Sequence, residues 1–202
     1  MTATPSIDLL ERADAAPDSR RATGFTVWFT GLSGAGKTTI ADLVGADLAR
    51  RGLDVEHLDG DVVRTHLSSG LGFSKADRDM NVDRIGWVAS RLTRHGAVVL
   101  VSSISPYEDA RIRARRRVEE FGPFVEVFVE TSLEECARRD VKGLYVKALA
   151  GEIGAFTGVS DPYEPPSDPE LRIATANEEP EESARRVLDK LAELELIGGA
   201  DS

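Results

Sequence analysis

The octapeptide at positions 31–38 constrains the fold of this chain more than any other feature. It reads Gly-Leu-Ser-Gly-Ala-Gly-Lys-Thr, follows the apolar run FTVWFT at 25–30 and precedes a helical pattern over 38–51. A G-x-x-x-x-G-K-[ST] sequence between a strand and a helix is a P-loop, whose backbone N–H groups point at phosphate oxygens. The N-terminus of the helix adds a partial positive charge. We therefore predict a nucleotide site in which Lys37 reaches the β- and γ-phosphates and Thr38 is a ligand of Mg²⁺.

Apolar runs typical of buried strands alternate with helical segments along the chain. Strands are expected at 25–30, 54–58, 97–101, 124–130 and 171–175, and helices at 38–51, 75–95 and 181–196. Strands that are separated by helices form a parallel sheet covered by helices on both faces. The sequence thus predicts an α/β protein with the P-loop NTPase fold and a five-stranded parallel sheet. Its 202 residues suit one domain, expected over 24–202 after an N-terminal extension at 1–23.

The alternation breaks between 139 and 169, where glycines and prolines accumulate. So long an irregular stretch inside a compact domain indicates either disorder or a functional lid. Its aromatic and basic side chains, such as Tyr145 and Lys147, favour a lid.

Capping residues predict where several helices begin. Ser74, with Asp77 three positions later, predicts a helix from 75. Thr131 and Glu134 form a capping-box pattern for the helix after the fourth strand. Ser105 before Pro106 suits the N-cap and first position of another helix.

Composition excludes several classes of function. The net charge of −10 argues against nucleic acid as a partner, because that partner needs a basic surface. No apolar run approaches the roughly 20 residues that span a bilayer, and residues 1–23 lack the apolar core of a targeting peptide. The single cysteine, Cys136, excludes an internal disulfide and fits a reducing cytoplasm.

Five arginines between 111 and 117 form either a solvated helix face or an anion-attracting rim beside a site.

A second polar cluster, Asp59-Gly60-Asp61-Val62-Val63-Arg64, follows the second strand. Carboxylates at the C-terminal ends of parallel strands face the crevice in which ligands bind. Asp61 is therefore expected to hold Mg²⁺ through water or to accept the proton of an acceptor hydroxyl, or else to cap a short helix at 62–67. Asp59 is either a turn former or a site residue, and Arg64 is placed to pair with an anion.

The reaction class follows from what accompanies the P-loop. The Asn-Lys-x-Asp motif of GTPase switches is absent. A small P-loop protein with a Gly-rich lid is typical of a kinase that closes over a small acceptor and excludes water. The alternatives are a kinase for a nucleoside monophosphate or a sugar acid, and a nucleotide-binding regulatory subunit without turnover.

Several longer motifs then narrow the class. GLSGAGKTT, DGDVVR, LGFSKADRDMN, ISPY, KGLYVKALAGEIGAFTG and DPYEPP occur in this order over 24–175. Together they resemble the adenylylsulfate kinase (APS kinase) family. The resemblance implies transfer of the γ-phosphoryl group of ATP, with Mg²⁺, to the ribose 3′-hydroxyl of adenosine 5′-phosphosulfate (APS). The products are the sulfate donor PAPS and ADP, so the expected process is sulfate activation.

The resemblance also assigns residues to the acceptor. Arg64, Arg78 and Asn81 are expected to bind its phosphosulfate and ribose region. Phe73 and Phe156 are expected to sandwich its adenine, although either ring would also suit the core. Other expected contacts are Ile104, Ser105 and the lid residue Lys142.

On the ATP side, the resemblance places Arg139 against the adenine and, more weakly, Thr175 nearby. The expected ATP-binding set is Gly31, Leu32, Ser33, Gly34, Ala35, Gly36, Lys37, Thr38, Thr39, Arg139 and Thr175. Lys37, Asp61 and Ser105 are the candidate catalytic residues, and Thr38 and Asp61 are the candidate Mg²⁺ ligands. None of the three histidines, His57, His66 and His95, is assigned a role.

Ser105 has competing interpretations. In the family that the chain resembles, this serine is linked to a phosphoserine intermediate. A serine without an adjacent base is a poor nucleophile, and the sequence places none beside it. Substrate contact or helix capping, with direct transfer to the acceptor, is the alternative.

The chain departs from the family pattern at three places. Val82-Asp83 stands where a basic pair is usual, Val146 replaces a basic lid residue, and Ser103 replaces an aromatic before Ile104. These differences bear on lid electrostatics and acceptor affinity rather than on the reaction class. The resemblance further implies a homodimer, and a separately encoded ATP sulfurylase that supplies APS.

Overall fold

The computed structural model describes residues 24–140, 142–176 and 178–198. The predicted N-terminal extension at 1–23 lies outside the described residues. The fold has a five-stranded parallel sheet of order β2-β3-β1-β4-β5. Its strands are β1 (Phe25–Thr30), β2 (Val55–Asp59), β3 (Val98–Ser102), β4 (Phe124–Val129) and β5 (Leu171–Ile173). The predicted sheet is confirmed, with shifts of one residue in β2 and β3 and a shorter β5.

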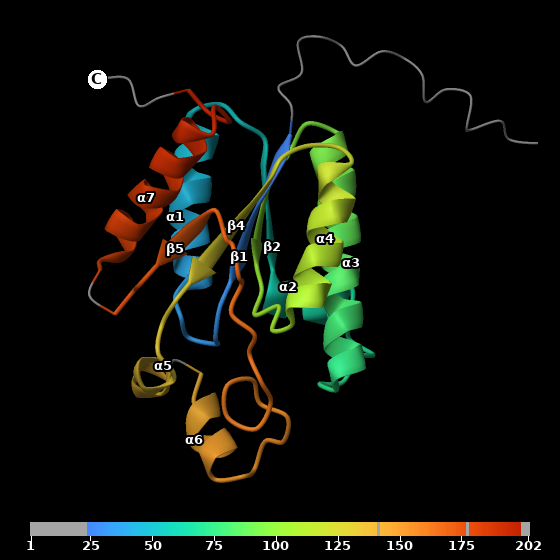
Figure 1. Ribbon diagram of the computed structural model, residues 1–202, viewed down its shortest axis with the longest axis vertical. Coiled ribbons are helices and arrows are strands. Elements are labelled where there is room, and N and C mark those ends of the chain that lie inside the picture. The colour runs from blue at the N-terminus through green and yellow to red at the C-terminus, as the bar shows by residue number, and fades with distance from the viewer. Residues whose placement is uncertain (1–23, 141, 177, 199–202) are drawn as a thin grey trace, which may run out of the picture.

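Helices cover both faces of the sheet, as predicted. Figure 1 shows α1 (Lys37–Arg50) and α7 (Pro180–Glu193) on one face, with α3 (Lys75–Arg94) and α4 (Glu108–Glu119) on the other. The short helices are α2 (Gly60–His66), α5 (Leu133–Arg139) and α6 (Leu144–Leu149). No helix among the described residues is long and apolar enough to cross a membrane.

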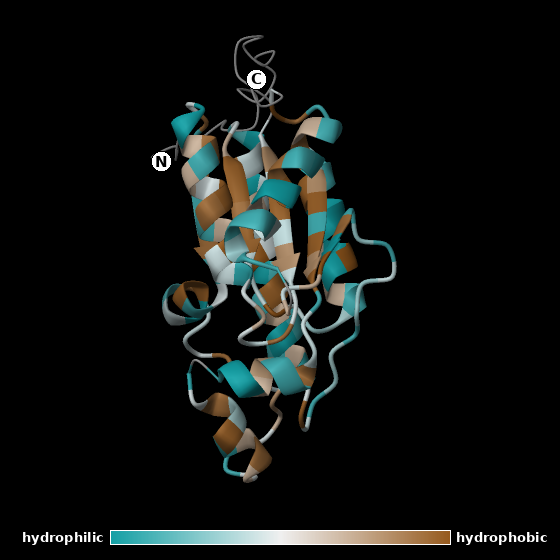
Figure 2. Ribbon diagram, turned by 90° about the vertical axis from the view of Figure 1, so that its left-hand side faces the viewer, coloured by the Kyte–Doolittle hydropathy of each residue, from teal (hydrophilic) through white to brown (hydrophobic). Residues whose placement is uncertain are grey.

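The alternation of side chains along β1 divides the core into two layers. Val27 and Phe29 pack with α1 and α7, whereas Trp28 packs with α3 and α4. All three side chains are fully buried. The hydropathy colouring in Figure 2 shows apolar strands enclosed by helices whose outward faces are polar. Because both faces are covered, the strands are apolar throughout their length, as parallel strands are.

Helix ends test the capping predictions. Ser74 accepts a hydrogen bond from the Asp77 N–H at the start of α3, which confirms that prediction. For α5 the cap is Ser132, so the prediction of Thr131 is wrong by one residue. The Thr131 hydroxyl instead contacts the Thr175 hydroxyl at 2.6 Å. Thr131 therefore contacts the loop after β5. The sequence alone could not show this contact between distant segments.

The structure also excludes two capping roles that the sequence left open as alternatives. Asp59, and not Asp61, caps α2, because its side chain accepts from the Asp61 and Val62 N–H groups. The residue that precedes α4 is Tyr107, so Ser105 does not cap that helix. Both results leave the side chains of Asp61 and Ser105 available for other contacts.

The stretch 139–169 contains one ordered helix, α6, and a loop beyond the C-terminal ends of the strands (Figure 1). The return arm of this lid, residues 161–167, is attached to the loop before α4. The Tyr107 hydroxyl donates to Asp161 at 2.8 Å, and the Glu164 N–H donates to the Pro106 carbonyl at 2.8 Å. The lid therefore joins the body through a fixed arm.

Candidate active site

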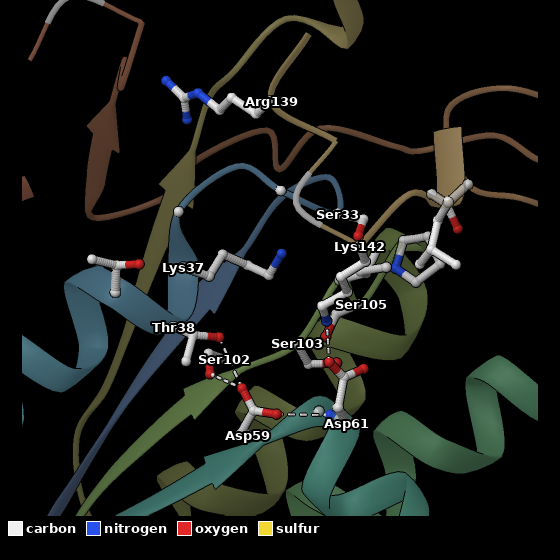
Figure 3. A pocket seen from close by; sticks show the side chains of 18 of the residues that line it. Ser33, Lys37, Thr38, Asp59, Asp61, Ser102, Ser103, Ser105, Arg139 and Lys142 are labelled. Atoms are coloured by element: carbon white, nitrogen blue, oxygen red, sulfur yellow. Dashed lines mark hydrogen bonds and ion pairs between the residues drawn. The ribbon is translucent and has the colours of Figure 1, made fainter. Parts of the chain in front are cut away.

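A cavity of about 1220 Å³ lies at the C-terminal edge of the sheet, between the P-loop, α3, the loop after β3 and the lid. Figure 3 shows side chains from the P-loop, the loop after β3 and the lid around it. The predicted residues that line it are Ser33, Gly34, Gly36, Lys37, Thr38, Thr39, Asp61, Arg64, Phe73, Arg78, Asn81, Ile104, Ser105, Arg139, Lys142, Phe156 and Thr175. The residues predicted to bind ATP and those predicted to bind the acceptor therefore line the same cavity.

Gly31, Leu32 and Ala35 do not line the cavity but form the base of the P-loop. The Lys37 ammonium donates to the carbonyls of Gly31 at 3.0 Å and Leu32 at 2.7 Å. Gly36 has φ of 106°, a left-handed conformation that L side chains rarely adopt. Burial lowers the pKa of Lys37 to about 8. The P-loop therefore holds the partly desolvated Lys37 ammonium beside its backbone N–H groups.

Asp59 is a site residue that the sequence left undecided. Its Oδ2 accepts from the Thr38 hydroxyl at 2.8 Å and from the Ser102 hydroxyl at 3.2 Å. Its Oδ1 accepts the two N–H groups that begin α2. Burial alone would raise the pKa of Asp59, but these hydrogen bonds outweigh it and leave the pKa below its ordinary value. All four lone pairs are used, so Asp59 orients Thr38.

Asp61 lies farther out, where its side chain is 72% exposed. Lys142 of the lid forms an ion pair with Asp61 and donates a hydrogen bond to Oδ2. Lys142 therefore extends into the cavity, where its partner is a carboxylate of the body, and its predicted contact with the acceptor stays a prediction. Sequence reasoning missed this pair because the two residues lie in different motifs.

The predicted acceptor residues form a second wall. The Arg64 guanidinium lies 4.4 Å from the centre of the Phe73 ring and donates to the Gly72 carbonyl at 2.9 Å. Phe73 is 54% exposed, so it is not a core residue. The Phe156 ring contacts the Tyr145 ring edge to face, with 5.0 Å between the ring centres, so it packs against the core and also lines the cavity.

Two buried polar side chains complete this wall. Arg78 is buried, so it is not a surface helix residue, and it donates to the Phe73 carbonyl at 3.0 Å. It also binds the Ala155 carbonyl of the lid. The Asn81 Oδ1 atom is buried and has no hydrogen-bond partner among the described residues. A buried amide oxygen without a partner is costly, and a ligand hydroxyl in the cavity would satisfy it.

Ser105 is almost fully buried and has φ of 45°. Its hydroxyl accepts from the Trp28 indole N–H at 3.1 Å. Within the part of the chain that the structure describes, no histidine or carboxylate hydrogen-bonds to this hydroxyl. The arrangement gives Ser105 no general base, as its local sequence also indicates.

Arg139 lies at the opposite end of the cavity. Its guanidinium donates to the Thr175 carbonyl at 2.8 Å and to the Glu135 carboxylate at 2.8 Å. These contacts hold a planar cation at the mouth, where Figure 3 shows it apart from Lys37. Both predicted residues of this end, Arg139 and Thr175, are thus brought together.

The arginines of α4 do not form a rim around the cavity, and none of the five lines it. Arg111 is buried, so the solvated-face interpretation fails for it as well. Its Nε lies 2.8 Å from Glu126 Oε1, in an alignment too poor for a hydrogen bond, so this contact is mainly coulombic. Its other nitrogens donate to the carbonyls of Ser105 and Glu164. Arg111 therefore joins the loop after β3 to the lid arm.

The sheet order, the P-loop, the carboxylates at the strand ends and the lid define a P-loop kinase of a small acceptor. The sequence pattern of the adenylylsulphate kinase family matches residues 23–174. The chain belongs to this family, and it is an ATP-using kinase that phosphorylates adenylyl sulfate.

Individual relatives agree with this assignment. An adenylyl-sulfate kinase of Picosynechococcus sp. is 58% identical over 174 residues, which are 86% of this chain and 97% of the relative. The structure of the Mycobacterium tuberculosis APS kinase in complex with AMPPNP and APS has a TM-score of 0.81 at 46% identity, covering 84% of this chain and 98% of that chain. A hexameric APS kinase from Thiobacillus denitrificans is 40% identical with a TM-score of 0.69, covering 88% of this chain and 30% of that chain.

Proposed function

We propose that the cavity transfers the γ-phosphoryl group of ATP directly to the ribose 3′-hydroxyl of APS, giving PAPS and ADP. The P-loop and Lys37 hold the phosphates, and Arg139 with Thr175 holds the ATP adenine. Arg64, Arg78 and Asn81 bind the acceptor, whose adenine stacks between Phe73 and Phe156. The observation that carries the proposal is one cavity that is lined by both sets of residues and by Asp61.

Direct transfer is favoured by the surroundings of Ser105. Its hydroxyl accepts from the Trp28 indole, and no side chain among the described residues accepts a hydrogen bond from it. Asp61, in contrast, is exposed at the cavity and carries a carboxylate that can accept the proton of the 3′-hydroxyl. Ser105 then contacts the substrate and shapes the site without acting as a nucleophile. Catalysis comes mainly from positioning and from charge stabilisation by Lys37 and Lys142.

The residues present suit Mg²⁺, which prefers oxygen ligands. The Thr38 hydroxyl donates a hydrogen bond to Asp59, so the lone pairs of its oxygen can bind a cation. Asp61 has exposed oxygens close to the same loop, and we propose that Thr38 and Asp61 hold the ion. When bound, Mg²⁺ would neutralise phosphate charge. Asp59 keeps the Thr38 oxygen oriented.

The test is incubation of the purified protein with Mg·ATP and APS, followed by separation of PAPS and ADP. Asp61→Ala is expected to abolish turnover, because the proton acceptor and a metal ligand are lost. Ser105→Ala is expected to retain turnover. Loss of turnover in Ser105→Ala with a phosphoprotein in the wild type would establish the intermediate. Phosphorylation of a nucleoside monophosphate or a sugar acid in preference to APS would overturn the acceptor assignment.

Three further proposals concern the setting of the reaction. The enzyme acts as a homodimer in the cytoplasm, and an ATP sulfurylase on another chain supplies its APS. The buried free thiol of Cys136 suits a reducing compartment. Light scattering on the full chain checks the oligomeric state, and a monomer at micromolar concentration would contradict the proposal.

A further inference from the structure

A line of hydrogen-bonding groups leads from Asp59 at the cavity to His57 and Asp42, which do not line it. The His57 ring lies between Asp42 of α1, 3.0 Å from Nδ1, and Ser102 of β3, 2.7 Å from Nε2. The Ser102 hydroxyl continues the line to Asp59 Oδ2 at 3.2 Å. Asp59 ends it at the Thr38 hydroxyl. Three elements of the fold therefore contribute to one chain of contacts that reaches the P-loop.

The positions of the protons along this line determine which groups donate and which accept. Ser102 has one hydroxyl proton, and it stands between a ring nitrogen and a carboxylate oxygen. If Nε2 carries no proton, it competes with Asp59 for the Ser102 proton. If Nε2 carries a proton, it donates to Ser102 Oγ, and the Ser102 proton is directed to Asp59. Asp42 and Asp59 are both carboxylates, which can only accept. Both ends of the line are satisfied when Nδ1 donates to Asp42 and Nε2 donates to Ser102, so the geometry favours the second arrangement.

Burial limits the replacement by water of the contacts in the inner part of this line. Ser102 is 3% exposed, so water has little access to the junction between His57 and Asp59. The Asp42 side chain is 64% exposed, so water can replace it as a partner of Nδ1. The contact with Ser102 therefore matters more for Asp59 than the contact with Asp42 does.

We infer that His57 is a positioning residue for the kinase reaction, because its Nε2–H directs the Ser102 proton to Asp59, the carboxylate that orients the Thr38 hydroxyl. This inference rests on the proposed role of Thr38 in binding Mg·ATP. It predicts that His57 affects the use of ATP while leaving the acceptor wall unchanged. His57 does not line the cavity, so it acts only through the other residues.

Kinetics of single and double variants provide the first test. His57→Leu and Ser102→Ala are each expected to lower kcat/KM for ATP about tenfold, the loss typical of one hydrogen bond to a charged group. The KM for APS should stay within about twofold. The double variant should be no worse than the poorer single variant, because both act through one line.

His57→Gln is the conservative variant, because its amide nitrogen can occupy the position of Nε2 and donate to Ser102. It should restore kcat/KM for ATP to within about threefold of the wild type. His95→Leu is the control, because His95 is exposed at the end of α3 and does not line the cavity. Thermal unfolding of each variant separates loss of function from loss of folding.

A ring ¹⁵N spectrum of the unmodified protein supplies a measurement that needs no variant to fold. His57 should show a protonated Nε2. Wild-type turnover in both His57→Leu and Ser102→Ala, multiplicative losses in the double variant, or an unprotonated Nε2 would each overturn the inference. Absence of PAPS formation by the wild type would instead count against the proposed function, and the spectrum would still decide the state of His57.

Discussion

Lys142 of the lid and Asp61 in the first turn of α2 form an ion pair across the cavity, although 81 positions separate them in the chain. Both side chains are more than half exposed, so the pair contributes little to stability. Its position matters more, because it connects the lid to the carboxylate proposed to receive the proton. Binding of substrates must exchange this pair for contacts with phosphate and hydroxyl groups.

Lys142→Met should therefore separate activity from stability. We expect kcat/KM for APS to fall about tenfold to a hundredfold, because a charge-assisted contact with an anion is lost. The free energy of unfolding should change by less than about 1 kcal/mol. Steady-state kinetics and urea denaturation measure the two effects. Lys147→Met, in the same lid but outside the cavity, is the matched control, and an equal loss of activity there would refute a specific role for Lys142.

The buried Lys37 predicts how ATP use depends on pH. Burial lowers its pKa to about 8 in the folded protein, so the ammonium form of the free enzyme is lost as the pH rises through that value. Because the ammonium form binds the phosphates, kcat/KM for ATP should fall above about pH 8, and ATP binding near that pH should take up protons. Calorimetry in buffers of different ionisation enthalpy measures this uptake. In Lys37→Arg the residual activity should lose this dependence, and an unchanged profile would contradict the assignment.

Phe73 predicts a change confined to the acceptor. Its exposed ring is available for stacking, which is worth about 1–3 kcal/mol per base. Phe73→Ala should raise the KM for APS about fivefold to a hundredfold, with the KM for ATP unchanged. Phe73→Leu keeps apolar bulk without a π-face and should recover little of the loss. Full recovery by leucine would mean that the ring only fills space.

Arg111 predicts a large cost in stability. Removal of Arg111 leaves Glu126 buried without its nearest cation, so Arg111→Met should lower the free energy of unfolding by about 3–5 kcal/mol. Burial already raises the pKa of Glu126 despite the two nearby arginines, Arg111 and Arg115. Urea denaturation measures the change, with the exposed Arg116→Met as the control. Arg111→Met combined with Glu126→Leu should recover much of the loss, and a double variant less stable than the single one would contradict this account.

The sequence predicted the parts of the site that depend on local pattern. The P-loop, the strands and the Ser74 cap follow from neighbouring residues, and apart from the shorter β5 the structure places them within a residue of the expected positions. The arginines of α4 could not be assigned, because the partners of Arg111 lie on β4 and the lid arm. The role of Asp59 was missed for the same reason, since Thr38 and Ser102 come from other elements.

The hydrogen bond from Trp28 to Ser105 makes the fluorescence of Trp28 sensitive to changes at Ser105. The chain has two tryptophans. Trp28 is fully buried behind the acceptor loop, whereas Trp87 on α3 is 57% exposed. Iodide will therefore quench Trp87 selectively, and the remaining blue-shifted emission will belong to an indole whose N–H contacts Ser105. Any ligand or phosphorylation that displaces the Ser105 hydroxyl will change this emission, so occupation of the acceptor site can be followed by fluorescence without a label.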